Sequence, residues 1–418
     1  MTKGSVSMST SLRRVVRSVL GSCVGVAIVA TALQGTAQAA PADVQPPGQD
    51  VFYTPPSPLP QGKPGDVIRS RQSPYPTFGD AKAWQVLYRS ESATGEPIAV
   101  SGTVVVPTKA WTGKGKRPLV TWGVGTRGLG DACAPSYTLA TGLDYEALFI
   151  ADALSRGWAV AITDMQGLGT PGQHTYEVGQ SQGRAVLNIA RAAERFGETG
   201  IAADAPVGIM GYSQGGTSAG WAAQLAASYA PDLQVKGTAA GGVPADLLAV
   251  AKSLDQGPFA ALMYMAAVGY DAAYPELNLQ KYLNENGKKL LADTKDICLV
   301  SVDIVPALFN TAFKKISDFT TTSPLDQPDW QARLKENRLG GTAPSAPVFQ
   351  AQAVFDEIIP FQQADTLHKE WCAKGANVTW KTYLFAEHAL GMVQSEPDAM
   401  TFLADRFAGK PAQGNCAA

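Results

Sequence analysis

Alternating and apolar segments divide the chain from residue 84 onward. Two segments with alternating apolar and polar positions, Trp84–Ser90 and Ile98–Val106, predict antiparallel strands at the start of a sheet. Apolar strands then alternate with segments of helical periodicity. The predicted strands are Pro118–Trp122, Trp158–Thr163, Pro206–Met210 and Val235–Ala240, and the predicted helices are Tyr145–Arg156, Gly183–Phe196 and Gly215–Tyr229. This order is typical of a doubly wound, mostly parallel α/β sheet.

The alternation stops near residue 245 and returns near residue 336. The intervening segment is mainly helical in pattern, partly apolar (Phe259–Gly269) and partly charged (Gln280–Leu291). After it, the predicted strands are Ala346–Ala353 and Val378–Phe385, and the predicted helices are Phe361–Lys374 and Glu396–Phe407. We therefore expect one α/β core, residues 66–244 and 336–418, interrupted by a helical insertion of residues 245–335.

The N-terminus has the pattern of an export signal. Three arginines precede an apolar stretch from Val19 to about Leu33, and the small-residue sequence Ala37-Gln38-Ala39 follows it. This predicts a secretory signal peptide over residues 1–39, cleaved near Ala39. Residues 40–65 are rich in proline and predict a stiff, extended lead-in. No later apolar run is long enough to span a bilayer, so we expect no transmembrane segment in the mature chain.

Composition narrows the function classes. Of the 418 residues, 45% are hydrophobic and 17% charged, which excludes a disordered chain, and the net charge of −2 gives no basic footprint for nucleic acid. Four cysteines follow the signal peptide, and in an oxidising compartment we expect two disulfides. Of the three possible pairings we favour Cys133–Cys298 with Cys372–Cys416, because the other two would tie the last residues to the middle of the chain. With three histidines and no metal-ligand spacing, we expect no metal site.

The candidate nucleophile is Ser213 in Gly211-Tyr212-Ser213-Gln214-Gly215. This G-x-S-x-G sequence lies between a predicted strand and a predicted helix, where a sharp turn lifts the serine above the sheet. Glycines flank the turn because larger side chains would clash with the next elements. The backbone N–H of Gln214, at the helix start, is a candidate oxyanion donor.

The base and the acid should follow the serine along the chain. His388 comes after the strand Val378–Phe385, in a strand-end loop, whereas His174 precedes Ser213 and suits a loop-stabilising hydrogen-bond partner. His368 lies within a predicted helix and is expected at the surface. Asp356 follows the strand Ala346–Ala353 and is the candidate acid, with its neighbour Glu357 as the rival.

The second oxyanion donor should come from the loop after the strand Pro118–Trp122. In that loop, residues 123–128, we expect the backbone N–H of Thr126 to serve, with Gly125 as the next choice. The same residues match G-x-G-x-x-G, a dinucleotide pattern, and so do residues 167–172. Neither match opens directly into a helix, so we expect no nucleotide and no other cofactor.

Taken together, these motifs resemble the secretory lipase family of the α/β-hydrolase superfamily. The resemblance extends from about Ser101 to His388 and rests on residues 133–136, 167–172, 183–186, 211–216, 355–356 and 387–388. One departure is Val124-Gly125, where bacterial members often carry His-Gly. The resemblance implies the Ser213, Asp356 and His388 triad, two disulfides, and the helical insertion as a cap over the site where long acyl chains bind.

The implied activity is hydrolysis of carboxylic esters by a secreted lipase or esterase through an acyl-enzyme. The expected partner is an ester or lipid substrate, and a lipid–water interface is one place to meet it. Because fold and triad do not choose the acyl acceptor, amide deacylation and acyl transfer are alternatives. A catalytically inactive secreted binding protein on a hydrolase scaffold is the alternative from another class.

Overall fold

Within residues 44–416, which the computed structural model describes, nine strands form one sheet in the order β1-β2-β3-β5-β4-β6-β7-β8-β9. The strands are β1 (Val67–Ser73), β2 (Ala81–Glu91), β3 (Pro97–Pro107), β4 (Leu119–Gly123), β5 (Ala159–Thr163), β6 (Pro206–Tyr212), β7 (Gln234–Gly241), β8 (Val348–Ala353) and β9 (Val378–Tyr383). The first three pair antiparallel and β3 is antiparallel to β5, while the pairs from β5 to β9 are parallel. The predicted mostly parallel, doubly wound sheet is confirmed.

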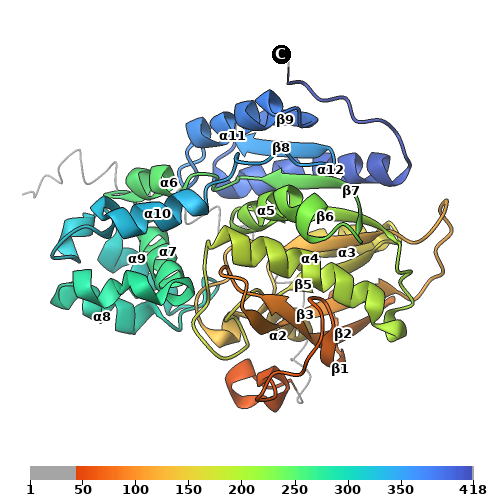
Figure 1. Cartoon of the computed structure of the whole chain (residues 1–418), viewed down its shortest axis with the longest axis horizontal. Helices are drawn as coiled ribbons and strands as arrows, with labels where there is room; N and C mark the ends of the chain where they lie inside the picture. The colour runs from red at the N-terminus through yellow and green to blue at the C-terminus, as the bar shows by residue number, and fades with distance from the viewer. Residues whose placement is uncertain (1–43, 417–418) are drawn as a thin grey trace, which may run out of the picture. The chain divides into compact units, whose positions relative to one another are not determined.

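Helices cover both faces of the sheet (Figure 1). One face packs against α4 (Gly179–Arg195), α5 (Gln214–Tyr229) and α11 (Phe361–Ala373), and the other against α2 (Pro135–Thr141), α3 (Ala147–Ser155) and α12 (His388–Phe407). Each face has its own apolar core, because every central strand buries side chains on both sides. The carboxyl ends of the parallel strands therefore carry the loops on a rigid support.

The segment between β7 and β8 consists of helices that lie together at one side of the sheet (Figure 1). They are α6 (Leu247–Leu254), α7 (Ala260–Ala273), α8 (Glu285–Thr294), α9 (Ile304–Thr311) and α10 (Pro328–Glu336). The predicted helix Gln280–Leu291 is wrong at its start. A 3₁₀ turn, Leu279–Tyr282, comes first, and α8 begins at Glu285 because the Asn284 side chain accepts a hydrogen bond from the Gly287 N–H.

Strand β1 and helix α12 also differ from the sequence prediction. Strand β1 was not predicted, because its sequence, Val-Ile-Arg-Ser-Arg-Gln-Ser, is mostly polar and it lies half-exposed at the sheet edge. Helix α12 begins at His388, eight residues before the predicted start. Pro397 lies inside this helix, and a proline favours the first turn of a helix, which displaced the prediction toward it.

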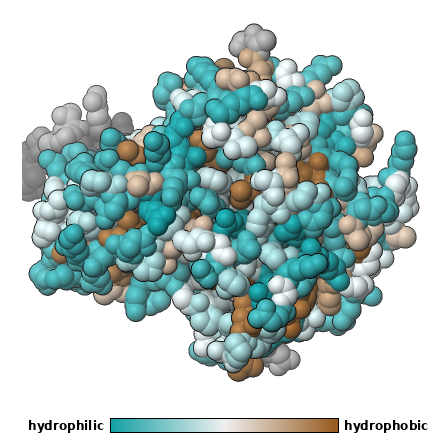
Figure 2. Space-filling view, viewed as in Figure 1, coloured by the Kyte–Doolittle hydropathy of each residue, from teal (hydrophilic) through white to brown (hydrophobic). Residues whose placement is uncertain are grey.

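Polar residues cover most of the molecular face in Figure 2, where apolar residues occur singly or in small groups. Among the helices of residues 44–416, none has the length and apolar character needed to cross a membrane. The predicted signal peptide, residues 1–39, lies outside the described residues.

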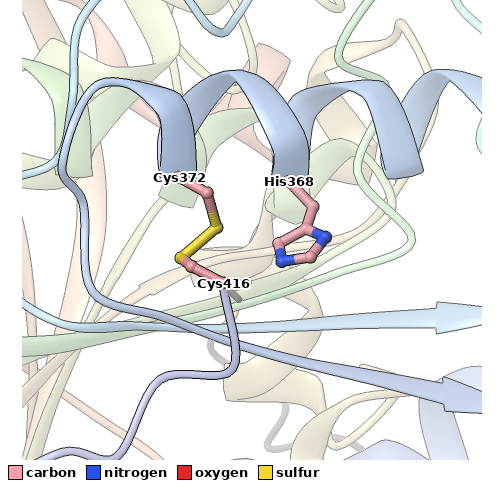
Figure 3. A group of neighbouring side chains, drawn as sticks. All are labelled: His368, Cys372 and Cys416. Carbon is pink, nitrogen blue, oxygen red and sulfur yellow. A yellow bond between two sulfur atoms is a disulfide. The ribbon is translucent and has the colours of Figure 1, made fainter. Parts of the chain in front are cut away.

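Two disulfides tie distant segments together. Cys133, just after the β4 loop, bonds to Cys298 in the insertion, and Cys372 on α11 bonds to Cys416 in the C-terminal tail (Figure 3). His368 lies beside the second bond, but its ring stacks on Trp380 and is 8% exposed, so its expected surface position is wrong. The sulfurs of Cys372 and Cys416 next to His368 are bonded to each other, so neither is available as a thiolate ligand for a metal ion.

The tail disulfide generates a stability prediction. Replacing Cys372 and Cys416 together by alanine should lower the free energy of unfolding by about 2–5 kcal/mol, because the bond restricts the unfolded chain over a separation of 44 residues. Thermal and denaturant unfolding of the secreted protein would measure this. An unchanged midpoint would contradict a stabilising role for this disulfide.

Candidate active site

Ser213 occupies a strained turn between β6 and α5. Its φ of 60° and ψ of −124° lie outside the regions that residues with a Cβ readily adopt. A Cβ at Gly211 would approach the Gly215 carbonyl oxygen to 2.1 Å, and a Cβ at Gly215 would approach the Gly123 carbonyl oxygen to 2.1 Å. Only glycine fits at both positions, so the two glycines allow β4 and α5 to close around the turn.

The predicted serine, histidine and aspartate lie in one hydrogen-bonded chain. The Ser213 Oγ is 2.9 Å from His388 Nε2, and His388 Nδ1 is 2.9 Å from both carboxylate oxygens of Asp356. The three residues come from the β6–α5 turn, the start of α12 and the loop after β8. His388 was expected in a loop, but it is the first residue of α12, so a helix fixes its backbone.

Asp356 has a fully buried side chain that accepts several hydrogen bonds besides that of the histidine. The backbone N–H groups of Ile358 and Ile359 donate to Oδ1 at 3.1 and 2.7 Å, and Gln352 Nε2 donates to Oδ2 at 3.1 Å. Burial lowers the pKa of His388, but the Asp356 carboxylate and the charges of Glu357 and Glu387 together raise it by more, so the net pKa lies above its ordinary value. The aspartate is thus placed to hold the imidazole orientation and to stabilise an imidazolium.

The two glutamates near the histidine hold its backbone. Glu357, the rival acid, accepts a hydrogen bond from the His388 N–H at 3.1 Å rather than approaching the ring. Glu387 caps α12 by accepting from the N–H groups of Ala389 and Leu390. Both carboxylates also raise the pKa of His388 through their charge.

Two backbone N–H groups are the candidate oxyanion donors. Gln214 is the first residue of α5, where a helix N–H has no intrahelical partner. In the loop after β4, the Gly125 N–H donates to Glu146 Oε1 at 2.7 Å, so it is already used. Among the described residues, the Thr126 N–H has no acceptor, and its Oγ1 lies 2.8 Å from the Tyr176 hydroxyl. This arrangement favours Thr126 over Gly125 as the second donor.

A buried charge cluster holds that loop in place. The Arg127 guanidinium donates to both oxygens of Asp144 at 3.0 and 2.8 Å and to Glu146 Oε1 at 3.1 Å. Its cation lies 3.8 Å above the Tyr145 ring, and the Tyr145 hydroxyl donates to the Thr126 carbonyl. These residues are not among the site residues expected from the sequence. The available signal was an arginine within a glycine-rich loop directly after an apolar strand.

His174 contacts the side chain of Gln214, the residue after the serine. Its Nδ1 lies 2.8 Å from the Gln166 carbonyl and its Nε2 lies 2.9 Å from the Gln214 side-chain amide. Burial lowers the pKa of His174 to about 4, so the ring is neutral and Nε2 accepts from the amide. The expected role of His174 as a hydrogen-bond partner is confirmed, and it orients the residue that follows the serine.

An apolar cavity begins at Ser213. Its empty volume is about 1080 Å³, part of it open to solvent. Helices α6, α7, α8 and α10 of the insertion supply much of the wall, and the core contributes Tyr176, Glu177, Pro244, Ile358 and Ile359. Ser213 and the helices of the insertion thus line one cavity whose wall is mostly apolar.

Comparison with known proteins gives consistent matches. The secretory lipase family model matches residues 133–415. The chain is 33% identical over 382 residues to a probable inactive lipase of Mycobacterium tuberculosis, with 87% of this chain and 83% of that protein covered. It is 30% identical over 416 residues to a secreted triacylglycerol lipase of Malassezia globosa, with 94% and 89% covered.

Among solved structures, Candida antarctica lipase A matches with a TM-score of 0.81 and 28% identity, covering 90% of each chain. The sheet and its flanking helices thus have the α/β-hydrolase arrangement.

The strained turn generates a stability prediction. Glycine at residue 213 relieves the strain of a Cβ at positive φ, about 1–3 kcal/mol, and loses part of that gain through its greater unfolded-state freedom. We expect Ser213→Gly to be about 1 kcal/mol more stable than Ser213→Ala, which removes the same hydroxyl but keeps the Cβ. Parallel unfolding curves of the two variants would test this, and equal midpoints would contradict the strain.

Proposed function

The chain belongs to the secretory lipase family, and on that premise we propose that it is an active secreted serine hydrolase that cleaves carboxylic esters of lipids. The observation that carries the proposal is the unbroken hydrogen-bonded chain from Asp356 through His388 to Ser213. A serine hydroxyl becomes a nucleophile when a base accepts its proton and a third group orients that base. All three parts are present at hydrogen-bond distance.

The proposed mechanism follows from the positions of these groups. His388 Nε2 takes the proton of Ser213 as the serine oxygen attacks the ester carbonyl, and Asp356 stabilises the imidazolium that forms. The backbone N–H groups of Gln214 and Thr126 stabilise the oxyanion. The imidazolium then protonates the leaving alcohol, and a water molecule activated by the same histidine releases the acid from the acyl-enzyme.

The proposed acyl site is the apolar cavity that begins at Ser213. We propose that residues 245–335 act as the cap over it, since their helices supply much of its wall. An alkyl chain placed there gains about 0.8 kcal/mol for each buried CH₂ group. This favours long-chain lipid esters over short soluble ones. Export through cleavage near Ala39 would bring the enzyme to such substrates outside the cell.

A catalytically inactive binding protein is the competing function, and one relative at 33% identity carries the name probable inactive lipase. The intact chain of Ser213, His388 and Asp356 supports activity in the present protein. Amide deacylation and acyl transfer use the same acyl-enzyme and differ only in the bonds broken and the acceptor.

Activity-based labelling tests the proposal. A fluorophosphonate should label Ser213 of the secreted protein and not its Ser213→Ala variant, because only a serine activated by a base reacts. Hydrolysis of p-nitrophenyl esters from acetate to palmitate, with emulsified triglyceride beside them, should show highest kcat/KM for long chains.

The alternatives give different results in the same experiment. Folded wild-type protein that neither reacts with the fluorophosphonate nor cleaves any ester would refute the enzyme and favour the binding protein. Labelling without ester hydrolysis would favour amide substrates. Product esters formed when an alcohol is added would favour acyl transfer.

The pKa of His388 generates a pH prediction. The histidine must be neutral to accept the serine proton, and its pKa lies above the ordinary value of 6.5. At pH values below this pKa, kcat/KM should therefore fall tenfold per pH unit. Glu357→Gln removes a negative charge that raises this pKa and keeps an acceptor for the His388 N–H. The acid limb of the profile should therefore move to lower pH in this variant.

The matched comparison is Asp356→Asn, which should lower kcat about 10⁴-fold, because an amide no longer fixes the imidazole tautomer. An acid limb that stays in place in Glu357→Gln, or an Asp356→Asn variant with near-normal kcat, would contradict the assigned roles.

A further inference from the structure

One carboxyl group stands out in the apolar cavity. Among the residues that line it, Glu177 is the one with a carboxylate, and most of the others are aliphatic or aromatic. Glu177 is 4% exposed, and no Lys or Arg pairs with it among the described residues. Burying a carboxyl group without a cation costs free energy.

The two oxygens of Glu177 have different surroundings. Oε2 accepts a hydrogen bond from the Thr217 hydroxyl at 2.6 Å. No hydrogen bond joins Oε1 to any residue of the range 44–416, and Oε1 is not among the fully buried unpaired atoms of that range, so the space of the cavity reaches it. One acceptor oxygen of a buried side chain therefore remains available on the cavity wall.

The backbone at this residue is also strained. Glu177 has a φ of 60°, in the left-handed region that residues other than glycine seldom adopt. Helix α7 packs directly on the preceding residue, since a Cβ at Gly269 would approach the Tyr176 carbonyl oxygen to 2.3 Å. Strained backbone of this kind is found at functional sites, where the surrounding packing maintains it.

Glu177 lies at the nucleophile end of the cavity. Its partner Thr217 follows Ser213 by one helical turn, a rise of about 6 Å along α5. Its chain neighbour Tyr176 reaches the oxyanion loop through the bond to Thr126 Oγ1. An acyl chain bound to Ser213 and extending into the cavity would therefore pass Glu177 with the carbons closest to its carbonyl group.

We propose that Glu177 determines specificity for acyl chains that carry a hydroxyl group close to the ester carbonyl. This rests on the proposed ester hydrolysis. The hydroxyl donates to Oε1 and so satisfies the open acceptor, while the rest of the chain binds the apolar wall. A plain acyl chain, one without a hydroxyl group, would cover the same oxygen and offer it no hydrogen-bond donor. Leaving an acceptor buried and unpaired is unfavourable.

The protonation of Glu177 strengthens this preference as the pH rises. Burial raises the pKa of Glu177 to about 7, although the Thr217 hydroxyl and the charge of His388 act against the shift. The titratable groups that face it are His388 on α12, Tyr176 on its own segment and Tyr270 on α7. Both forms of the carboxyl group accept a hydrogen bond, but the charged form makes a plain chain more costly to bind.

Three octanoate esters test the proposal on the secreted protein: p-nitrophenyl octanoate, its β-hydroxy analogue and its ω-hydroxy analogue. We expect kcat/KM for the β-hydroxy ester to exceed that for the plain ester about tenfold, the effect of one hydrogen bond to a charged group. The ratio should increase above pH 7. The ω-hydroxy ester should show no gain, because its hydroxyl lies far from the carbonyl.

Variants separate recognition from a structural role. Glu177→Met should reduce the ratio to about one and raise kcat/KM for the plain ester, a gain that mere damage to the fold would not produce. Glu177→Gln keeps an acceptor and should retain part of the preference without its increase above pH 7. Glu194→Met removes a carboxyl group of α4 that does not line the cavity, and should leave the ratio unchanged.

Binding distinguishes failure of this proposal from failure of the proposed function. In the Ser213→Ala background, calorimetry with the corresponding methyl esters should show the same tenfold preference, and Glu177→Met should abolish it. If no ester is hydrolysed, the proposed function fails and this binding preference still decides the role of Glu177. Equal affinities for the two methyl esters, or a preference that survives Glu177→Met, would overturn the proposal.

Discussion

The site depends on one backbone constraint, the reversal of the chain at a single residue between β6 and α5. Ser213 can hold its φ of 60° only because Gly211 and Gly215 let the turn approach β4. The same reversal starts α5 at Gln214, so the N–H proposed to face an oxyanion is set by the turn that presents the hydroxyl. The proposed nucleophile and the proposed oxyanion donor are thus two consequences of one strained conformation.

The groups around this turn are fixed by buried charge. Arg127 with Asp144 and Glu146 holds the oxyanion loop, and Glu357 holds the backbone of His388. Buried ion pairs give little net stability, because desolvation offsets their attraction. Their contribution here is geometric: each bond fixes an atom beside the reacting groups. Such directional support is what a site needs to keep its donors in position before substrate arrives.

The sequence predicted the alternation of strands and helices, and the positions of Ser213, Asp356 and His388 relative to the strands, because both follow from local periodicity and chain order. It did not predict β1, whose polar residues form a strand only by pairing with β2. It also placed His388 in a loop, since Pro397 obscured the start of α12. Glu177 could not be recognised, because its surroundings come from segments far apart in the chain. Arg127 stood out only as an arginine in a glycine-rich loop, and that pattern does not identify Asp144 and Glu146 as its partners.

Residues 176 and 177 line the cavity, and Tyr176 also contacts the loop after β4. This limits how far the proposed acyl selectivity and the proposed oxyanion stabilisation can change independently. Residues 176 and 177 contact α7 on one side, while their side chains reach Thr126 and Thr217 on the other. The Cys133–Cys298 bond joins the insertion to the core close to the same loop, and Gly128 pairs with Cys298 there. Most cavity residues lie on the insertion helices, away in sequence from Asp356 and His388. On the proposed roles, a change at residues 176–177 would instead alter acyl recognition and the position of an oxyanion donor together.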